Sequence, residues 1–337
     1  DYARSANPTR KALEANLASL EGGCRGFNFA SGLAAQAACI HLLASGDHVV
    51  LSDDVYGGTY RQFDKVFKQF GITYTRANLT DLNAAEAAFK SNTKMVWLET
   101  PTNPLLKVID IAAVARLAKS KGALTVVDNT FATPVLTNPL ALGADIVSHS
   151  CTKYIGGHSD VIGGVLICRD DELANRLRFT QNAVGAIAAP WDSFLLLRST
   201  KTLHVRVQRH CENAARIADF LAEQKQIERV VYPGRTDHPQ HEIAKKQMIG
   251  GFGGMITAYF KGGLEPARTF LERVKLFSLA ESLGGVESLI EHPAIMTHAS
   301  VDKHLREQIG LTDGLVRFSV GIEDVEDLIA DIQEALG

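Results

Sequence analysis

The stretch ADIVSHSCTKYIGG, residues 144–157, joins an apolar strand to a cluster of reactive side chains. The apolar residues before Ser148 indicate a buried strand, and Ser150, Thr152 and Lys153 follow it at once. Ligands of open parallel sheets bind beyond the carboxyl ends of the strands. We therefore expect these three side chains to line a site at one edge of a sheet.

Short apolar runs like this one recur through the first half of the chain. They have little polar alternation, which is typical of strands buried on both faces; they are HVVLSDD from residue 48, KMVWLET from 94, LTVVDNT from 124, ADIVSHS from 144 and GGVLIC from 163. Helical patterns separate them. One begins at Asn7 and Pro8 and places Leu13, Leu17 and Leu20 on one face, and another runs from Asp110 to Gly122. The alternation predicts an α/β fold with a mainly parallel sheet covered by helices on both sides.

The pattern changes after about residue 190. The run SFLLLRSTKTLHVRVQRHCENAARIADFLAE predicts a long helix that can bend, and four apolar runs follow it: IERVVYP, GMITAYF, LFSLA and VRFSVGI. The last pattern, DVEDLIADIQEAL, is helical. We expect a large domain over residues 1–205 and a smaller C-terminal α/β domain over 206–337, with the long helix as the hinge.

Composition excludes several classes of protein. The chain of 337 residues has a net charge of -3, which gives no electrostatic reason to expect nucleic acid. It shows neither an apolar run that could span a membrane nor a secretion signal, and its five cysteines form no C-x-x-C pair. His149 and His158 flank the lysine segment without a third ligand, so we expect no metal. We expect a cytoplasmic protein.

Other polar residues follow the neighbouring strands. Thr100, Thr102 and Asn103 come after the run that begins at residue 94, and Asp128, Asn129 and Thr130 come after LTVV. In SGLAA, Ser31 caps a helix that we expect to end at Gly46, and its small first turn, Gly32, Leu33 and Ala34, leaves amide groups available to an anion. Neither G-x-x-x-x-G-K-[ST] nor a strand followed by G-x-G-x-x-G occurs, so the usual nucleotide fingerprints are missing.

A helix-start anion site, a strand-end acid and a strand-end lysine together match pyridoxal 5'-phosphate (PLP). The lysine amine would form an imine with the aldehyde, and the acid would keep the ring nitrogen protonated. Hydroxyl groups beside the lysine would bind the phosphate. This explains why Ser150 and Thr152 flank Lys153.

In order and spacing, the chain resembles the PLP-dependent enzymes of cysteine and methionine metabolism, the cystathionine γ-lyase and γ-synthase family. The resemblance covers nearly the whole chain and is carried by YARSANPT, SGLAA, DDVYGGTYR, ETPTNP, VVDNTF, SCTKYIGGHSD, AESLGGVESL, MTHAS and VRFSVGIED. It implies the PLP-dependent aminotransferase-like fold (fold type I).

The resemblance assigns roles around the cofactor. Lys153 would be the lysine that binds PLP and moves protons, Asp128 would pair with the ring nitrogen, and Tyr56 would stack on the ring and act near the substrate amine. These three are the expected catalytic residues. The expected cofactor-binding residues are Tyr2, Arg4, Gly32, Leu33, Tyr56, Asn103, Asp128, Thr130, Ser150, Thr152 and Lys153.

It also assigns the substrate contacts. Asn103 and Arg317, helped by Ser282, would bind the α-carboxylate, because the planar fork of arginine suits a bidentate contact. Glu281 and Arg61 would bind the charged groups at the distal end of cystathionine. Methionine γ-lyases usually carry a cysteine where this chain has Gly58.

Each site would be shared between subunits. In the family, residues equivalent to Tyr2 and Arg4 reach the phosphate of a neighbouring subunit, which implies a homotetramer built from active dimers. Family members usually carry a substantial arm before YARSANPT, and almost nothing precedes it here, so we expect the arm to be trimmed or absent.

We expect γ-elimination of L-cystathionine to L-cysteine, 2-oxobutanoate and ammonia, and the motif EHPAIMTHASV resembles the lyases. The alternative is cystathionine γ-synthase, which replaces the γ-substituent of O-succinyl- or O-acetylhomoserine with cysteine. A third hypothesis is a protein that binds PLP without catalysis, but the lysine, acid, tyrosine and arginine are all present.

Overall fold

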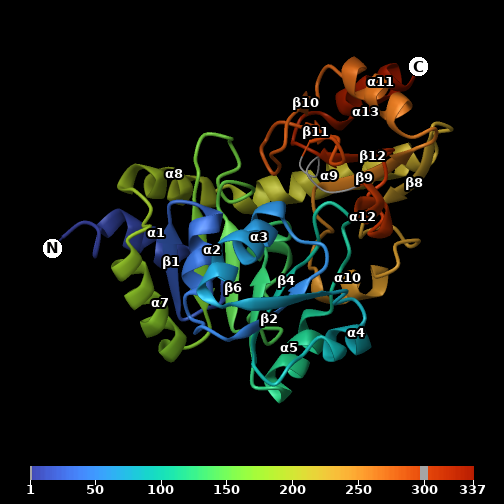
Figure 1. Ribbon diagram of the computed structural model, residues 1–337. Coiled ribbons are helices and arrows are strands. Elements are labelled where there is room, and N and C mark those ends of the chain that lie inside the picture. Colours follow the sequence, from blue (N-terminus) through green and yellow to red (C-terminus); the bar gives the residue numbers. More distant parts are fainter. Residues whose placement is uncertain (1, 297–302) are drawn as a thin grey trace. The chain divides into compact units, whose positions relative to one another are not determined.

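The computed structural model describes residues 2–296 and 303–337. It consists of two compact units (Figure 1): residues up to Thr100 with Ile109–Thr202, and Pro101–Val108 with Leu203–Gly337. The sequence placed the boundary between residues 205 and 206 and did not separate the short segment. Pro101–Val108 belongs to the second unit because it forms hydrogen bonds with residues of that unit. For example, the Pro104 carbonyl accepts a 2.6 Å hydrogen bond from the Thr257 hydroxyl.

A seven-stranded sheet forms the centre of the first unit. Its order is β1-β7-β6-β5-β4-β2-β3, and only β7 runs antiparallel to its neighbours. This confirms the mainly parallel sheet. The strands are β1 (Arg25–Phe29), β2 (His48–Ser52), β3 (Thr73–Ala77), β4 (Thr93–Glu99), β5 (Leu124–Asp128), β6 (Ile146–Ser150) and β7 (Gly164–Cys168).

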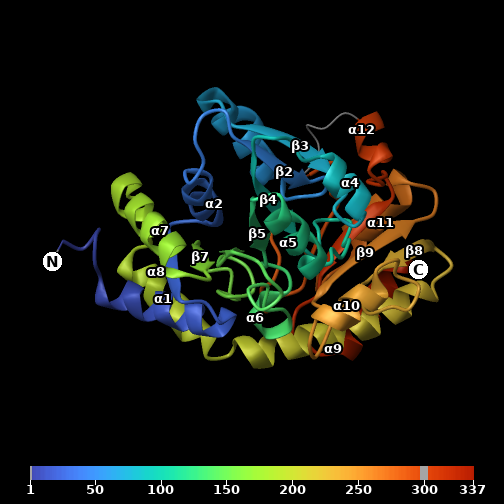
Figure 2. The ribbon, with the colours of Figure 1, turned by 90° about the horizontal axis from the view of Figure 1, so that it is seen from below.

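Helices lie on both faces of this sheet, as expected for an α/β fold. Figure 2 shows α1 and α2 on opposite sides of β7. The helices of this unit are α1 (Pro8–Glu21), α2 (Gly32–Ile40), α3 (Gly57–Arg61), α4 (Leu82–Ala87), α5 (Ile111–Ser120), α6 (Thr133–Leu136), α7 (Asp171–Val184) and α8 (Pro190–Thr200), with single π and 3-10 helices at Gln62–Val66 and Phe67–Phe70. The core between sheet and helices is apolar and includes the fully buried Phe29, Phe63 and Trp97.

Local signals position several helix starts. Asn7 accepts hydrogen bonds from the amides of Thr9 and Arg10 and caps α1, and Asp110 caps α5 in the same manner. The prediction that the helix after Ser31 extends to Gly46 is wrong. This helix, α2, ends at Ile40, because the chain then passes into tighter turns whose last residue, Gly46, has φ +94°.

The long helix expected after residue 190 is two helices. It breaks between α8 and α9 (Leu203–Ala222), at the boundary between the two units. The hydroxyl groups of Thr200 and Thr202 bond to the carbonyls of Leu197 and Ser199. Side chains that compete in this way for backbone acceptors weaken a helix, which accounts for the interruption.

The second unit is a smaller α/β unit around a five-stranded sheet of order β10-β11-β12-β9-β8. Its core contains Ile217, Ile256, Phe270, Phe318 and Leu328. The strands are β8 (Ile227–Val231), β9 (Met255–Phe260), β10 (Ser278–Leu279), β11 (Leu289–Glu291) and β12 (Leu315–Ser319), and the helices after α9 are α10 (His241–Gln247), α11 (Leu264–Arg273), α12 (Lys303–Gln308) and α13 (Val325–Leu336).

Strands β1, β3 and β11 are not identified by the sequence. The first two lie at the two edges of the larger sheet, and each mixes polar with apolar residues. Edge strands pair on one side only and need less continuous apolar character than central ones. Among residues 2–296 and 303–337, we find no helix with the length and apolarity that crossing a membrane requires.

Helix α1 supplies a test of the core. Leu13 and Leu17 are 0% and 1% exposed, whereas Leu20, predicted on the same face, is 39% exposed. We expect Leu17→Ala to lower the free energy of unfolding by about 2–5 kcal/mol, because it leaves a cavity. The matched change Leu20→Ala should cost less than about 1 kcal/mol. Urea unfolding of both variants measures the difference, and equal losses would contradict the packing described here.

Candidate active site

The polar residues predicted at the ends of β5 and β6 lie together at one edge of the larger sheet. Strands β5 and β6 are parallel, and Asp128, the last residue of β5, pairs with Ser148. Ser150 ends β6, and the turn after it contains the half-buried Lys153. The Lys153 amide donates to the Ser150 carbonyl at 3.2 Å, and its carbonyl accepts from Gly157 at 2.7 Å, so the turn is tightly closed.

Asp128 is held by Thr130. The Thr130 hydroxyl and amide donate to Asp128 Oδ1 at 2.6 and 3.0 Å, and the same hydroxyl accepts the Ser150 amide at 2.9 Å. One hydroxyl therefore links the ends of both strands. Desolvation by the surrounding protein raises the pKa of Asp128 above its ordinary value, although hydrogen bonds from Thr130 and nearby His149 oppose that shift.

The start of α2 faces Ser150. Ser31 caps this helix by accepting the Ala34 amide at 3.0 Å, and the first amides of a helix have no acceptor within it. A Cβ atom added to Gly32 would lie 3.0 Å from Ser150 Cβ and 3.1 Å from its Cα. Glycine thus allows the helix start to approach the strand end closely, and Gly32, Leu33 and Ser150 can surround an anion.

Thr152 is placed differently from Ser150. Its hydroxyl donates to the Gly163 carbonyl at 3.3 Å and accepts the Gly163 amide at 3.2 Å. In this arrangement Thr152 holds the turn that contains Lys153 against the segment that leads into β7. Its expected contact with the phosphate stays a prediction.

Tyr56 lies immediately before α3. Its amide donates to Glu99 Oε2 at 2.9 Å, and Glu99 is buried at the end of β4. A Cβ atom added to Gly58 would lie 2.3 Å from Tyr56 Cε1, so a larger residue there would displace the tyrosine ring. Tyr56 as a whole is 46% exposed.

Two bonds tie this segment to α2. Thr59 donates to Gln36 at 3.1 Å, and Gln62 donates to the Leu33 carbonyl at 2.8 Å. The segment that carries Tyr56 is therefore fixed to the helix that begins the anion site. Arg61 is exposed at the end of α3.

A second cluster of the predicted residues lies within the second unit. Arg317 is 2% exposed, and its Nη1 donates to Asn103 Oδ1 at 2.9 Å. Its Nη2 donates to the carbonyls of Ser282 and Glu281, at 3.0 and 3.1 Å. The structure thus brings Asn103, Arg317 and Ser282 together, whereas the Glu281 side chain is exposed.

Sequence reasoning missed the acid that pairs with Arg317. Glu291, fully buried in β11, lies 3.1 Å from Arg317 Nη1. The strands β11 and β12 bring them together, because Glu291 and Arg317 face each other in the antiparallel register. A signal was present, since an arginine buried on a central strand requires a counter-charge. No comparable signal in the sequence pointed to Glu99. It accepts a hydrogen bond from the Tyr56 backbone amide, a group that every residue except proline carries.

Tyr2 and Arg4 lie on the surface of the first unit. Tyr2 is 69% exposed, and the Arg4 guanidinium lies 5.1 Å from the centre of the Tyr2 ring. Arg4 also donates to the carbonyl and side-chain oxygens of Asn182 in α7. Their expected contact with a neighbouring subunit stays a prediction. Residues 297–301 of the motif EHPAIMTHASV, with most of MTHAS, lie outside the described residues.

The first unit contains groups that fit each part of PLP. The helix start beside Ser150 suits the phosphate, and the primary amine of Lys153 suits the aldehyde. Burial raises the pKa of Asp128, and a protonated ring nitrogen would supply a positive partner for its charge. The donor set therefore fits this cofactor.

Comparisons with known proteins agree with this arrangement. The model of the Cys/Met metabolism PLP-dependent enzyme family matches residues 1–337. A Lactococcus lactis protein named cystathionine beta-lyase is 56% identical over 337 residues, which cover 100% of this chain and 88% of the relative. A Dictyostelium discoideum protein named cystathionine gamma-lyase is 55% identical over 336 residues, covering 100% of this chain and 87% of the relative.

A Mycobacterium tuberculosis protein named cystathionine gamma-synthase is 52% identical, and the match covers 100% of this chain and 86% of the relative. Among solved structures, cystathionine gamma-lyase from Lactobacillus plantarum complexed with L-serine superposes with a TM-score of 0.97 at 48% identity, covering 99% of this chain and 87% of that one. This confirms the predicted PLP-enzyme fold. The chain belongs to the Cys/Met metabolism PLP-dependent enzymes, the family that includes cystathionine lyases and synthases.

Proposed function

We propose that this protein catalyses the γ-elimination of L-cystathionine, giving L-cysteine, 2-oxobutanoate and ammonia. The observation that carries a PLP-dependent lyase is the strand-end cluster of Lys153, Asp128 and Ser150 beside the start of α2. The γ-lyase reaction itself is supported by the similarity to the Dictyostelium and Lactobacillus proteins that carry that name.

Bound PLP supplies an electron sink for the charge that develops at the substrate α-carbon. Lys153 Nζ would bind the cofactor aldehyde and move protons between the substrate carbons and the departing sulfur. Asp128 would hold the proton on the ring nitrogen, and Tyr56 would stack on the ring and act near the substrate amine. The Gly32 and Leu33 amides, with Ser150 and Thr152, would bind the phosphate.

The substrate contacts in this proposal follow from the second cluster. Asn103 and Ser282 hold the Arg317 guanidinium in one orientation, and Glu291 keeps its buried charge compensated. A fixed, charged fork is suited to a carboxylate. We propose that Arg317 and Asn103 bind the α-carboxylate, and that Glu281 and Arg61 bind the distal amine and carboxylate. We also propose a homotetramer in which Tyr2 and Arg4 contact the phosphate of a neighbouring subunit.

The second candidate is β-elimination, which converts cystathionine into homocysteine, pyruvate and ammonia. It is favoured by the Lactococcus relative, which is 56% identical and is named a β-lyase. The alternative reaction at the substrate γ-carbon is that of cystathionine γ-synthase. It is supported by the Mycobacterium relative, which carries that name.

Products distinguish these reactions. With cystathionine as the substrate, we expect 2-oxobutanoate and cysteine to form faster than pyruvate and homocysteine, as measured by separating the two keto acids. Pyruvate as the main product would replace the proposal with β-lyase. Faster formation of cystathionine from O-succinylhomoserine and cysteine than its cleavage would replace it with γ-synthase.

The Lys153→Ala variant should fold and lose catalytic turnover. Removing the amine removes both the cofactor attachment and the proton carrier, and each function typically contributes two or more orders of magnitude to rate. Borohydride treatment followed by peptide mapping should find reduced cofactor on Lys153 of the wild type. The exposed lysine at the end of α5 provides a control, Lys119→Ala, which should keep full activity. Substantial elimination by Lys153→Ala would contradict the assignment.

Asp128→Asn should separate stability from cofactor binding. Because burial raises the Asp128 pKa from 3.8, this group stabilises the cofactor-free protein most below that pH, and the contribution is lost as the pH rises through the raised pKa. We expect the cofactor-free variant to melt at an equal or higher temperature than the wild type at pH 8, with a smaller difference at pH 5. Its PLP affinity should fall by about tenfold or more, from loss of a charge-assisted bond. A lower melting temperature at pH 8 with unchanged affinity would contradict both statements.

A further inference from the structure

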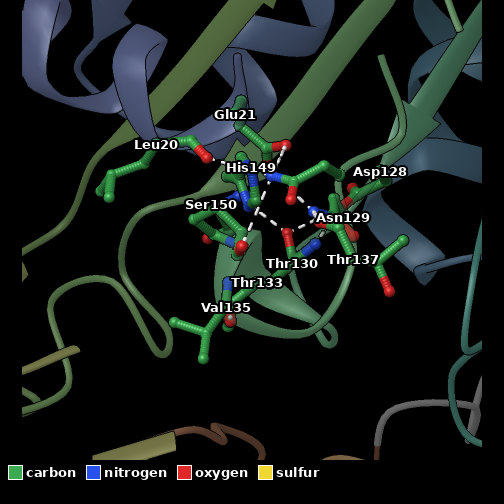
Figure 3. A network of polar contacts seen from close by, with 12 residues as sticks. Leu20, Glu21, Asp128, Asn129, Thr130, Thr133, Val135, Thr137, His149 and Ser150 are labelled. Carbon is green, nitrogen blue, oxygen red and sulfur yellow. Dashed lines mark hydrogen bonds and ion pairs between the residues drawn. The ribbon is translucent and has the colours of Figure 1, made fainter. Parts of the chain in front are cut away.

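A buried carboxylate lies behind the strand ends of the cofactor site. Glu21, the last residue of α1, is 1% exposed. Its Oε1 lies 2.6 Å from His149 Nε2 and accepts the Asn129 side-chain amide at 2.8 Å. Its Oε2 accepts the Asn138 side-chain amide at 3.5 Å. Figure 3 shows Glu21 close to His149 and Asn129, with Asp128 and Ser150 nearby.

The two Oε1 partners belong to different strands of the site. Asn129 directly follows Asp128 at the end of β5, and His149 directly precedes Ser150 at the end of β6. Successive side chains of a strand point to opposite faces. Asn129 and His149 therefore turn toward Glu21 while their neighbours, Asp128 and Ser150, turn the other way.

Separate hydrogen bonds join the ends of β5 and β6 on each face of the sheet. On the cofactor side, the Thr130 hydroxyl joins Asp128 to the Ser150 amide. On the far side, one oxygen of Glu21 joins Asn129 to His149. The Asn129 side-chain amide also donates to the Thr137 carbonyl at 2.9 Å, which fixes the turn that leads away from β5.

We propose that Glu21 is a positioning residue, which fixes through Asn129 and His149 the two strand ends that present Asp128, Ser150 and Lys153 to the cofactor. The inference rests on the cofactor site assigned in the proposed function.

The physical basis is that a carboxylate accepts hydrogen bonds and donates none. Both Asn129 and His149 must donate to Glu21, so His149 carries its proton on Nε2. Replacing the acid with leucine, a side chain of similar size, removes the shared acceptor from both of these donors. A buried donor without an acceptor is costly, so the two strand ends would move apart to reach other partners. Displacements of about 1 Å in a supporting group are enough to impair a site.

The test compares Glu21→Leu with a matched change on the same helix. Glu14 is also a largely buried carboxylate of α1, but it accepts from the Asn28 backbone in β1 and from Gln181 in α7, at 2.8 and 3.0 Å. Glu14→Leu therefore controls for the general cost of removing a buried carboxylate from this helix.

PLP would be titrated into each cofactor-free protein, with the visible absorption and circular dichroism of the bound cofactor as readouts. Melting temperatures of the same samples measure stability. We expect both variants to melt below the wild type. Only Glu21→Leu should bind PLP about tenfold more weakly and change the dichroism band, a loss of roughly 1.4 kcal/mol. Affinity within about twofold of the wild type, or an equal loss in Glu14→Leu, would overturn the inference.

A second pair of variants tests the inference if Glu21→Leu does not fold. His149→Gln keeps an amide donor for Glu21, and His149→Ala removes the donor. We expect His149→Gln to bind PLP at least fivefold more tightly than His149→Ala, and equal affinities would overturn the inference. Failure of the wild type to bind PLP would refute the proposed function itself. A wild type that binds PLP, with variants that bind it equally well, would refute only the role of Glu21.

Discussion

The parallel pairing of β5 with β6 is the constraint on which the candidate site depends. It places Asp128 beside Ser148, so that the residues after each strand emerge at the same edge of the sheet. Strand ends alone would leave these residues mobile, because their backbone groups leave the ladder there. The Thr130 hydroxyl and the Glu21 carboxylate replace the missing ladder bonds, one on each face.

Each of the two units buries a charged group that a folded protein would otherwise avoid. Burial raises the pKa of Asp128, so its ionised form lowers the stability of the protein without a cationic partner. Arg317 is buried as well, but Glu291 compensates its charge within the second unit. The two groups differ in a way that suits their proposed roles. Asp128 is suited to a permanently bound cation, whereas Arg317 is already paired and can bind a substrate that comes and goes.

Membership of the family determines the cofactor more strongly than it determines the reaction. Relatives that are 52–56% identical to this chain carry three different names: β-lyase, γ-lyase and γ-synthase. PLP and the lysine that binds it can serve all three, because each reaction begins with charge at the substrate α-carbon. In the proposed function, the outcome depends on how the distal part of the substrate is bound, and the exposed Glu281 and Arg61 are the residues proposed for that role.

The sequence by itself determined the α/β class, the strand ends that carry Asp128 and Lys153, and the helix caps at Asn7, Ser31 and Asp110. These are local properties, because periodicity and capping depend on residues a few positions apart. Only the tertiary structure decided that Glu99 holds Tyr56, that Glu291 pairs with Arg317 and that α8 and α9 separate. Glu21 and His149 are 128 positions apart and are joined by a single 2.6 Å contact. No local pattern encodes such a pair, because it exists only after the sheet and α1 have packed together.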